Sequence, residues 1–406
     1  MKRIGLVCLG LVLGLASTAH AQLTMQMTNG WNFTFSGNVN AFFIYQQTKA
    51  AGGGPTVAKD LGVGTGLLPA FAVFDAKGKE GNVDVGVHFG FAPQVEFGGH
   101  NASFFGTDAA GAQIDMREVY LTAGGSWGQL LMGKELALYQ RGNILTDMTL
   151  FGVGVGGAGR GTALGRIGYG YLYPDFRPQL TYSSPAGRPG QISIGLFDPI
   201  RVGPYTTAEL PRVEAEANWG SKTGENSNVK IFVNGAVQSM KNAPSGGTSL
   251  ASYGGGAGIV FDVSGFAITG SGFWSKGMGF LLQGDGIVGG ANFDNQGVSP
   301  IPDGSGKQQG RASFGYIGQL TYSPPNTKWI IGGSFGENRL RQNDQDKAAS
   351  GNDNEILKER LIDGQITYKW TKSLRWVAEY GHIDTYAGGV KTTKGNQGSL
   401  GMMLFF

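Results

Sequence analysis

Histidine and cysteine are too sparse in this sequence to suggest an enzyme's active site or a metal centre. The chain of 406 residues contains four histidines and one cysteine, and no two histidines lie at the spacing of a metal-binding pair. The Gly-x-Ser-x-Gly pattern occurs at 124–128 and 332–336, but at a short turn and within an expected strand, not at the strand-to-helix elbow of a nucleophilic serine. The glycine-rich stretch 152–161 lacks the Lys-Ser/Thr end of a phosphate-binding loop. We therefore expect no catalytic residue, no metal and no cofactor.

Charged side chains remain as the candidate functional groups. Several of them belong to the polar face of segments in which polar and apolar residues alternate, and others lie in the long stretch between two such segments. Fixed charges around a narrow aqueous path select ions by their sign, which is the chemistry that such residues could perform. The candidate residues are Lys134, Asp147, Arg160, Arg166, Arg177, Arg117 and Arg212.

The alternating segments have the pattern of β-strands. Between Trp31 and Tyr45, aromatic and aliphatic residues fill one set of alternate positions and Asn, Thr and Ser fill the other. A period of two belongs to a strand with one apolar and one polar face. The polar faces contain Gly, Asn, Ser and Thr rather than Lys and Glu, and aromatic residues gather at segment ends, which favours a membrane barrel over a soluble sandwich. The pattern recurs in 83–91, 191–196, 212–219 and 362–370.

Composition excludes several other classes of protein. Glycine accounts for 72 residues, charged residues for 15% and aromatic residues for 11%, whereas disordered chains are rich in charge and poor in aromatics. The net charge of +3 argues against a nucleic-acid partner.

The N-terminus resembles a secretory signal peptide. A basic start, Met1-Lys2-Arg3, precedes an apolar run over 4–15 and the small residues of Ala19-His20-Ala21. We expect cleavage after Ala21, so that residues 1–21 are the signal peptide and residues 22–406 the exported domain. No stretch of that domain reaches 18 consecutive apolar residues, so a place in a membrane would require a closed barrel.

The connections between alternating segments predict the number of strands. Seven are short and built from turn residues, so a barrel with both termini on the turn side has sixteen strands. The short connections are Ala76–Gly81, Gly124–Ser126, Ser184–Gly190, Gly220–Ser227, Ser264–Gly265, Ser323–Thr327 and Thr371–Ser373. The eight longer connections are 46–65, 93–113, 136–174, 198–208, 239–253, 276–311, 337–356 and 386–396.

Two stretches of the expected barrel carry further information. Residues 113–122 alternate irregularly, which predicts a bulge or a buried contact. Leu400, Met402, Leu404 and Phe406 form an apolar face that ends in a terminal aromatic residue. Such ends are typical of substrates of the outer-membrane assembly machinery, so we expect Phe406 to be an assembly signal.

Residues 119–135 and 177–185 resemble the Gram-negative general porins, which are trimeric and sixteen-stranded. The first stretch is similar to the family's hairpin, which has a Gly-containing turn, an aromatic-Gly pair and a final Gly-Arg-Gln. Here that end is Gly133-Lys134-Glu135, so Glu135 departs from the family's pattern. The second stretch is similar to the family's strand that begins with Arg and ends in a Ser-Pro turn.

The resemblance implies an all-β, antiparallel transmembrane barrel whose third loop, 136–174, folds inward and forms the constriction. It implies an outer-membrane homotrimer that passes ions and small hydrophilic solutes by passive diffusion. Its surroundings would be outer-membrane lipid and lipopolysaccharide. With Lys134, Arg177 and Arg117 on the wall and Asp147 on the loop, we expect weak anion preference. The alternative is a non-conducting structural or docking barrel that anchors or sheathes a partner protein.

Overall fold

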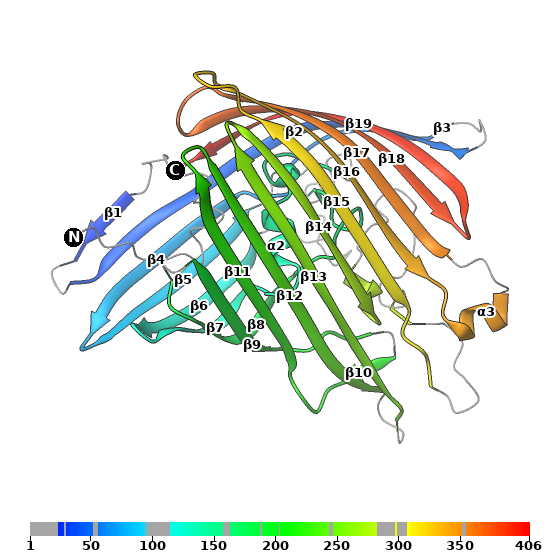
Figure 1. Cartoon of the computed structure of the whole chain (residues 1–406), viewed down its shortest axis with the longest axis horizontal. Helices are drawn as coiled ribbons and strands as arrows, with labels where there is room; N and C mark the ends of the chain where they lie inside the picture. Colours follow the sequence, from blue (N-terminus) through cyan, green and yellow to red (C-terminus); the bar gives the residue numbers. More distant parts are fainter. Residues whose placement is uncertain are drawn as a thin grey trace.

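The alternating segments form one closed antiparallel sheet, in which the last strand pairs with the first long one (Figure 1). The computed structural model describes residues 23–27, 30–51, 56–93, 95, 114–156, 163–186, 189–202, 204–242, 247–281, 297–298, 307–350 and 355–406. The expected signal peptide, 1–21, lies outside the described residues.

The strands follow one another around the barrel in the order of the sequence. They are β1 (Leu23–Gln26), β2 (Asn32–Ala50), β3 (Thr56–Gly64), β4 (Phe71–Glu80), β5 (Val83–Pro93), β6 (Ile114–Gly125), β7 (Gly128–Leu136), β8 (Phe176–Ser183), β9 (Gly190–Phe197), β10 (Tyr205–Thr207), β11 (Arg212–Gly224), β12 (Ser227–Asn242), β13 (Ser249–Val263), β14 (Phe266–Lys276), β15 (Ala312–Tyr322), β16 (Trp329–Arg341), β17 (Glu355–Lys369), β18 (Leu374–Ala387) and β19 (Val390–Phe405).

These segments occupy sixteen positions around the barrel, which confirms the predicted number. The strands β3 and β4 both pair with β2, end to end, and so share one position. The short β1 pairs with the start of β2, beyond the point where β19 stops. The short β10 pairs with the far end of β12, beyond β11. Neither short strand adds a position.

The described residues contain few helices, and these are short. They are α2 (Arg141–Leu145), α3 (Asp344–Ser350) and the 3₁₀ turns η2 (Met148–Phe151) and η3 (Gly279–Leu281). Among the described residues, no helix has the length and apolarity needed to cross a membrane.

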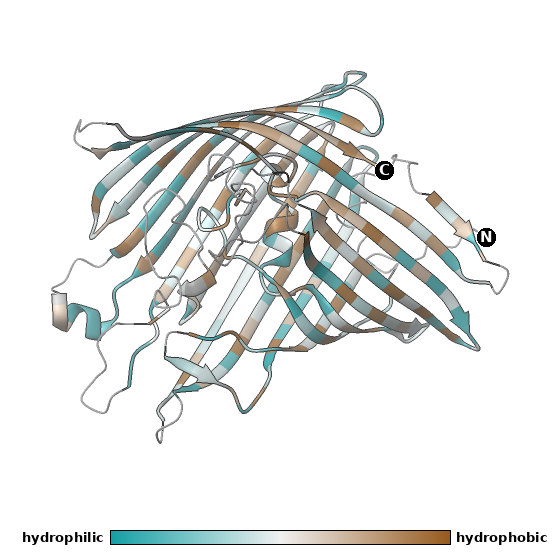
Figure 2. Cartoon of the chain, turned by 180° about the vertical axis from the view of Figure 1, so that it is seen from behind, coloured by the Kyte–Doolittle hydropathy of each residue, from teal (hydrophilic) through white to brown (hydrophobic). Residues whose placement is uncertain are grey.

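Apolar side chains dominate the outer face of the barrel and polar ones are frequent on its inner face, which appears as banding along the strands in Figure 2. On β17, for example, Ile362 and Ile366 are about half exposed, whereas Asp363 between them is buried. The barrel therefore reverses the arrangement of a soluble protein, because its large exposed side chains are apolar and many of its buried ones are polar. Such an exterior fits lipid.

All seven predicted short connections are confirmed as the turns of successive hairpins, from β4–β5 to β17–β18. The first described strand, β1, and the C-terminus lie at this end of the barrel, on the left in Figure 1. Three predicted long connections, 46–65, 239–253 and 386–396, are wrong. There β2 continues to Ala50, β12 continues to Asn242 and β19 begins already at Val390, so only short links remain. The polar residues that suggested loops remain paired across the ladder.

The irregular stretch 113–122 contains the predicted bulge. Opposite it, the register passes from Gly90–Glu118 to Phe91–Met116, which leaves Arg117 as an extra residue. The terminal Phe406 exchanges two backbone hydrogen bonds with Gly37, and its ring lies 5.2 Å from that of Phe35. The C-terminus therefore closes the barrel against β2.

Candidate functional site

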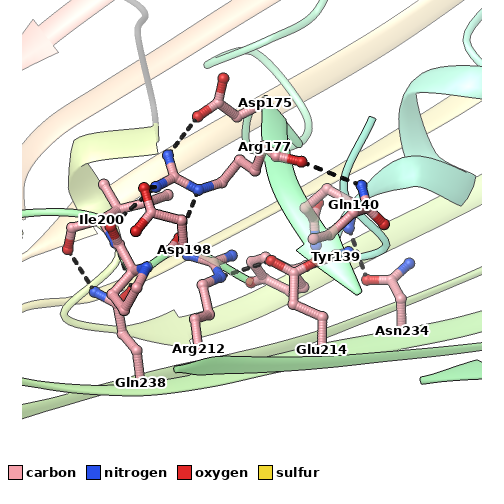
Figure 3. Close-up of polar contacts among 12 residues, drawn as sticks. Tyr139, Gln140, Asp175, Arg177, Asp198, Ile200, Arg212, Glu214, Asn234 and Gln238 are labelled. Carbon is pink, nitrogen blue, oxygen red and sulfur yellow. Dashed lines mark hydrogen bonds and ion pairs between the residues drawn. The ribbon is translucent and has the colours of Figure 1, made fainter. Parts of the chain in front are cut away.

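The segment between β7 and β8, called here the inner segment, comprises residues 137–156 and 163–175. Its backbone and side chains bond to inward-facing side chains of the wall, at positions far apart in the sequence. The first attachment is to β11 and β12 (Figure 3). The Tyr139 N–H donates to Glu214 Oε2 at 2.7 Å, and the Gln140 N–H donates to Asn234 Oδ1 at 3.0 Å.

A salt bridge strengthens this first attachment. The Arg141 guanidinium, from the start of α2, donates from Nε to Glu216 Oε2 at 2.9 Å. Glu216 and Glu214 share the inner face of β11, because residues two apart on a strand lie on the same side. The carboxylates that the sequence places on one face of 212–219 therefore hold the inner segment to the wall.

A second attachment reaches β15. Gln319 accepts a hydrogen bond from the Met148 N–H at 3.0 Å and donates one to the Thr146 carbonyl at 2.6 Å. Between them, Asp147 caps η2 by accepting from the N–H and the hydroxyl of Thr149. Burial and the Asp147 carboxylate raise the pKa of Tyr171 well above its usual value, so that its hydroxyl stays protonated and donates to Asp147 at 2.7 Å.

The third attachment is centred on Glu379 of β18. Its buried carboxylate accepts from the backbone N–H groups of Val153, at 3.0 Å, and Gly154. A side chain at Gly152 would overlap this carboxylate, so only glycine permits the close approach. On the neighbouring β19, Gln397 accepts from the Gly156 N–H at 3.0 Å.

The wall itself bends toward the inner segment where β3 ends and β4 begins. Residues 65–70 leave the ladder, and two of their N–H groups donate to the inner segment, Leu67 to Gly152 and Leu68 to Leu150. Asn40 of β2 supports the bend by donating to the Leu68 carbonyl at 2.9 Å and accepting from the Gly66 N–H at 2.8 Å.

Apolar side chains cover this framework. Ile144, Leu150, Ile167 and Tyr171 of the inner segment belong to a buried cluster that also includes wall residues. Wall and rim contribute Leu67, Val202, Tyr205, Ala236, Met240, Leu250, Phe273, Met278, Leu281, Val298, Ile317 and Leu340. Because their large side chains are buried and the polar anchors above surround them, the inner segment is held in one place and is not a freely moving loop.

Solved structures share this architecture. The outer membrane channel DcaP of Acinetobacter baumannii aligns with a TM-score of 0.69 at 14% identity, over 94% of this chain and 99% of that one. The chain has the fold of a sixteen-stranded porin. An anion-selective porin from Comamonas acidovorans aligns at 0.58 and 13% identity, over 93% and 100% of the two chains. OmpF of Salmonella typhi, in a complex with daunomycin, aligns at 0.55 and 10%, over 95% and 100%. No protein-family model and no curated protein matches the sequence.

Within this porin fold, the expectation for Lys134 is wrong, because its side chain lies on the outer face. It follows Leu130 and Met132 at alternate positions, and both are exposed apolar residues. Its partners across the sheet are Val119 and Pro178, and its ammonium donates to the Met116 carbonyl at 3.0 Å. The inward residue is its neighbour Glu135, which is buried.

Arg177 and Arg117 lie where their strands meet the long connections, and each pairs with carboxylates. Arg177 donates to Asp175 at 2.9 Å and reaches Asp198 at 3.5 Å (Figure 3). Arg117, the bulged residue, pairs with Asp115 at 2.8 Å and lies 5.5 Å from the ring centre of Phe176. These pairings cancel much of the positive charge expected at the wall.

The other predicted residues brace the interior. Arg212 is fully buried, pairs with Glu214 at 2.6 Å and lies over the Tyr139 ring. Arg166 is also fully buried and donates to the Leu361 carbonyl at 3.0 Å and to the Ser334 hydroxyl. Asp147 is only 3% exposed. Arg160 lies outside the described residues.

The sequence did not single out a cluster on the inner face of β4, β5 and β6. His88 is 1% exposed and lies between two carboxylates, with Nδ1 3.1 Å from Asp75 and Nε2 2.8 Å from Glu118. Both nitrogens can donate only when the ring is protonated. The ring of Tyr120 stacks on His88 at 4.5 Å. Strand alternation places His88 on a polar face, but only the pairing of three strands brings the acids to it. Among the described residues, no group of His, Cys, Asp or Glu has the arrangement of a metal site.

Proposed function

We propose that the protein is an outer-membrane channel for passive diffusion of ions and small hydrophilic solutes, without enzymatic activity. The observation that carries the proposal is the pairing of an apolar outer face with a polar, charged inner face around a closed sixteen-strand sheet. A barrel of this size is too wide for the side chains of the wall alone to fill.

We place the aqueous path between the inner segment and the arc from β4 to β8. The attachments of the inner segment run along β11, β12, β15, β18 and β19. The arc from β4 to β8 contributes the inward-facing Asp75, His88, Glu118 and Glu135. The inner segment would then set the pore size, as the constriction expected for 136–174.

The charges of this path favour cations, in place of the anion preference expected from the sequence. Lys134 is on the outer face, and Arg117, Arg177 and Arg212 are each paired with an acid. The inner wall from β4 to β11 presents five carboxylates, against the ammonium of Lys77, which pairs with Asp75 at 3.4 Å, the guanidinium groups of Arg212 and of Arg141 from the inner segment, and the imidazole of His88. Those carboxylates are Asp75, Glu118, Glu135, Glu214 and Glu216.

Liposome swelling tests the proposed channel. Vesicles that contain the purified protein should swell in isotonic solutions of small sugars, at rates that fall steeply as the sugar grows. Vesicles without protein are the control. Swelling no faster than in those vesicles, with protein shown to be folded and inserted, would refute the proposal.

The alternative is the non-conducting barrel that docks a partner. The observation in its favour is the apolar cluster that the inner segment builds within the barrel, since apolar filling excludes water. Under this alternative, folded protein would insert into vesicles and leave them impermeable to the smallest sugars.

The remaining expectations stand as proposals. We propose a signal peptide cleaved after Ala21, assembly that depends on Phe406, and a homotrimer. The exposed Phe43 and Tyr45 of β2 and Leu400 and Met402 of β19 form a continuous apolar outer surface that could pack against another copy. The lipids around the barrel would be those of a Gram-negative outer membrane, including lipopolysaccharide.

A further inference from the structure

The outer face of β16, β17, β18 and β19 changes character along the strands. Near the turn end, one row across the sheet joins Trp329, Tyr368, Trp376 and Met402. Near the opposite end, the same face carries the row Arg339, Lys358, Tyr386 and Lys391, and the adjacent row Glu337, Arg360, Asp384 and Lys394. Arg341 follows at the end of β16. We call these last two rows with Arg341 the rim patch.

The rim patch is basic. Six cations, Arg339, Arg341, Lys358, Arg360, Lys391 and Lys394, accompany the carboxylates of Glu337, Asp384 and, at the start of β17, Glu355. Together with Glu355, the patch therefore has a net charge of three positive units. Side chains in this position are not lumen residues, because alternation sends Asn338, Glu359 and Leu361 inward instead.

Buried contacts hold the cations in place. Glu337 is fully buried beneath Arg339, whose Nε donates to it at 2.6 Å, and Arg360, which bonds to its other oxygen. The Lys358 ammonium lies 4.0 Å from the centre of the Tyr386 ring, and the Arg341 guanidinium lies 4.8 Å from that of Phe314. A ligand would therefore meet donors that have already lost much of their freedom, which lowers the entropic cost of binding.

The height of the rim patch points to the ligand. Ten residues separate Trp329 from Arg339 on β16, and at about 3.3 Å per residue and a tilt of about 40° they span roughly 25 Å along the barrel axis. That is about the height of the apolar band of an outer-membrane barrel. If the aromatic row marks one edge of the lipid, the rim patch lies at the other, among the headgroups of the outer leaflet.

We infer that the rim patch binds the phosphate groups of a phosphorylated glycolipid of the outer leaflet. Guanidinium groups match phosphate oxygens with paired hydrogen bonds, and lysine adds point charge. The inference rests on the proposed outer-membrane location and adds to it a particular binding surface. A second copy of the chain would need a complementary acidic surface to occupy the same place.

The test is lipid binding by the full-length protein in detergent, measured by native mass spectrometry with bis-phosphorylated lipid A and with the same lipid dephosphorylated. The double variant Arg341→Glu/Lys394→Glu reverses two exposed cations and leaves the buried Glu337 network intact. The matched control, Lys134→Glu/Lys241→Glu, makes the same change of charge on the outer face of β7 and β12. Heat-modifiable migration on gels verifies that each variant folds.

We expect the parent to bind the phosphorylated lipid at least tenfold more tightly than the dephosphorylated one. The rim double variant should lose that preference, and the control should stay within twofold of the parent. Equal affinity of the parent for both lipids, or equal losses in both double variants, would overturn the inference. A rim variant that dissociates from an oligomer into single chains, with its lipid affinity unchanged, would also overturn the inference, because the patch would then bind a second copy of the chain. Conductance of the same variants in glycolipid-free bilayers tests the proposed channel separately.

Discussion

Glu379 provides the sharpest test of how the inner segment is held. The N–H groups of Val153 and Gly154 donate to different oxygens of the Glu379 carboxylate, so in the variant Glu379→Gln one of these two donors faces an NH₂ group instead of an acceptor. Gln365, which donates to the same carboxylate at 3.1 Å, loses the charge of its acceptor. The change is nearly isosteric, so it alters bonding and charge and leaves the packing alone.

The expected effect follows from these bonds. A hydrogen bond to a charged group contributes about 1.5–3 kcal/mol, and the variant loses one such bond and weakens another, so we expect the attachment of residues 152–154 to weaken by about 2 kcal/mol. Since each 1.4 kcal/mol is a factor of ten, the local opening equilibrium should rise roughly 30-fold. The barrel should keep its unfolding temperature within a few degrees, because the ladders of β17–β18 and β18–β19 are unchanged.

Hydrogen–deuterium exchange measured by mass spectrometry is the assay. Peptides that cover 150–156 should exchange about 30-fold faster in the variant, whereas peptides from β12 and β13 should not change. Ser399→Ala is the control, since Ser399 lies on the inner face of β19 and its buried hydroxyl has no hydrogen-bond partner among the described residues. Unchanged exchange over 150–156 in Glu379→Gln would refute the claim that this carboxylate anchors the segment.

Three further predictions concern the wall, the seat of the inner segment and the C-terminus. Glu118→Gln removes an inner-wall carboxylate beside His88, so the zero-current potential across a salt gradient should shift toward anion preference at 0.1 M salt. The shift should be much smaller at 1 M, because the Debye length falls from about 10 Å to about 3 Å. No shift at low salt would exclude Glu118 from the path. Gly254→Val would force a side chain into the Tyr139 hydroxyl, so the backbone amides of 137–145 should lose protection against hydrogen–deuterium exchange. Unchanged protection would contradict the close contact between Gly254 and Tyr139. Phe406→Ala removes the ring that packs near Phe35, and assembly in cells should fall while refolding in detergent remains near that of the parent; equal losses in both would point to stability instead of recognition.

Local patterns were sufficient to predict the barrel. Turn residues such as Ser264-Gly265 interrupt alternation sharply, so the hairpins and the number of strands could be read from the sequence. The lengths of the strands could not. Polar residues such as Gln46 and Thr48 look like loop residues in the sequence, but they continue the ladder because backbone pairing does not require an apolar side chain.

The site was harder to predict because it depends on which face a residue occupies and on distant partners. In Leu130-Leu131-Met132 both faces are apolar, so alternation could not settle on which side Lys134 lies. Glu379 and Val153 are 226 residues apart in the sequence, and only closure of the barrel brings them together. The salt bridges of Arg177 and Arg212 likewise change candidate pore charges into neutral pairs, which the sequence pattern alone does not reveal.

The conductance of single molecules in a planar phospholipid bilayer tests the central claim most directly. Insertion of the purified protein should produce steady, ohmic current steps, and the zero-current potential across a salt gradient should show cation preference at low salt. The account would be contradicted by folded, inserted protein that stays electrically silent, because the inner segment would then close the barrel and the protein would serve as a docking or structural element.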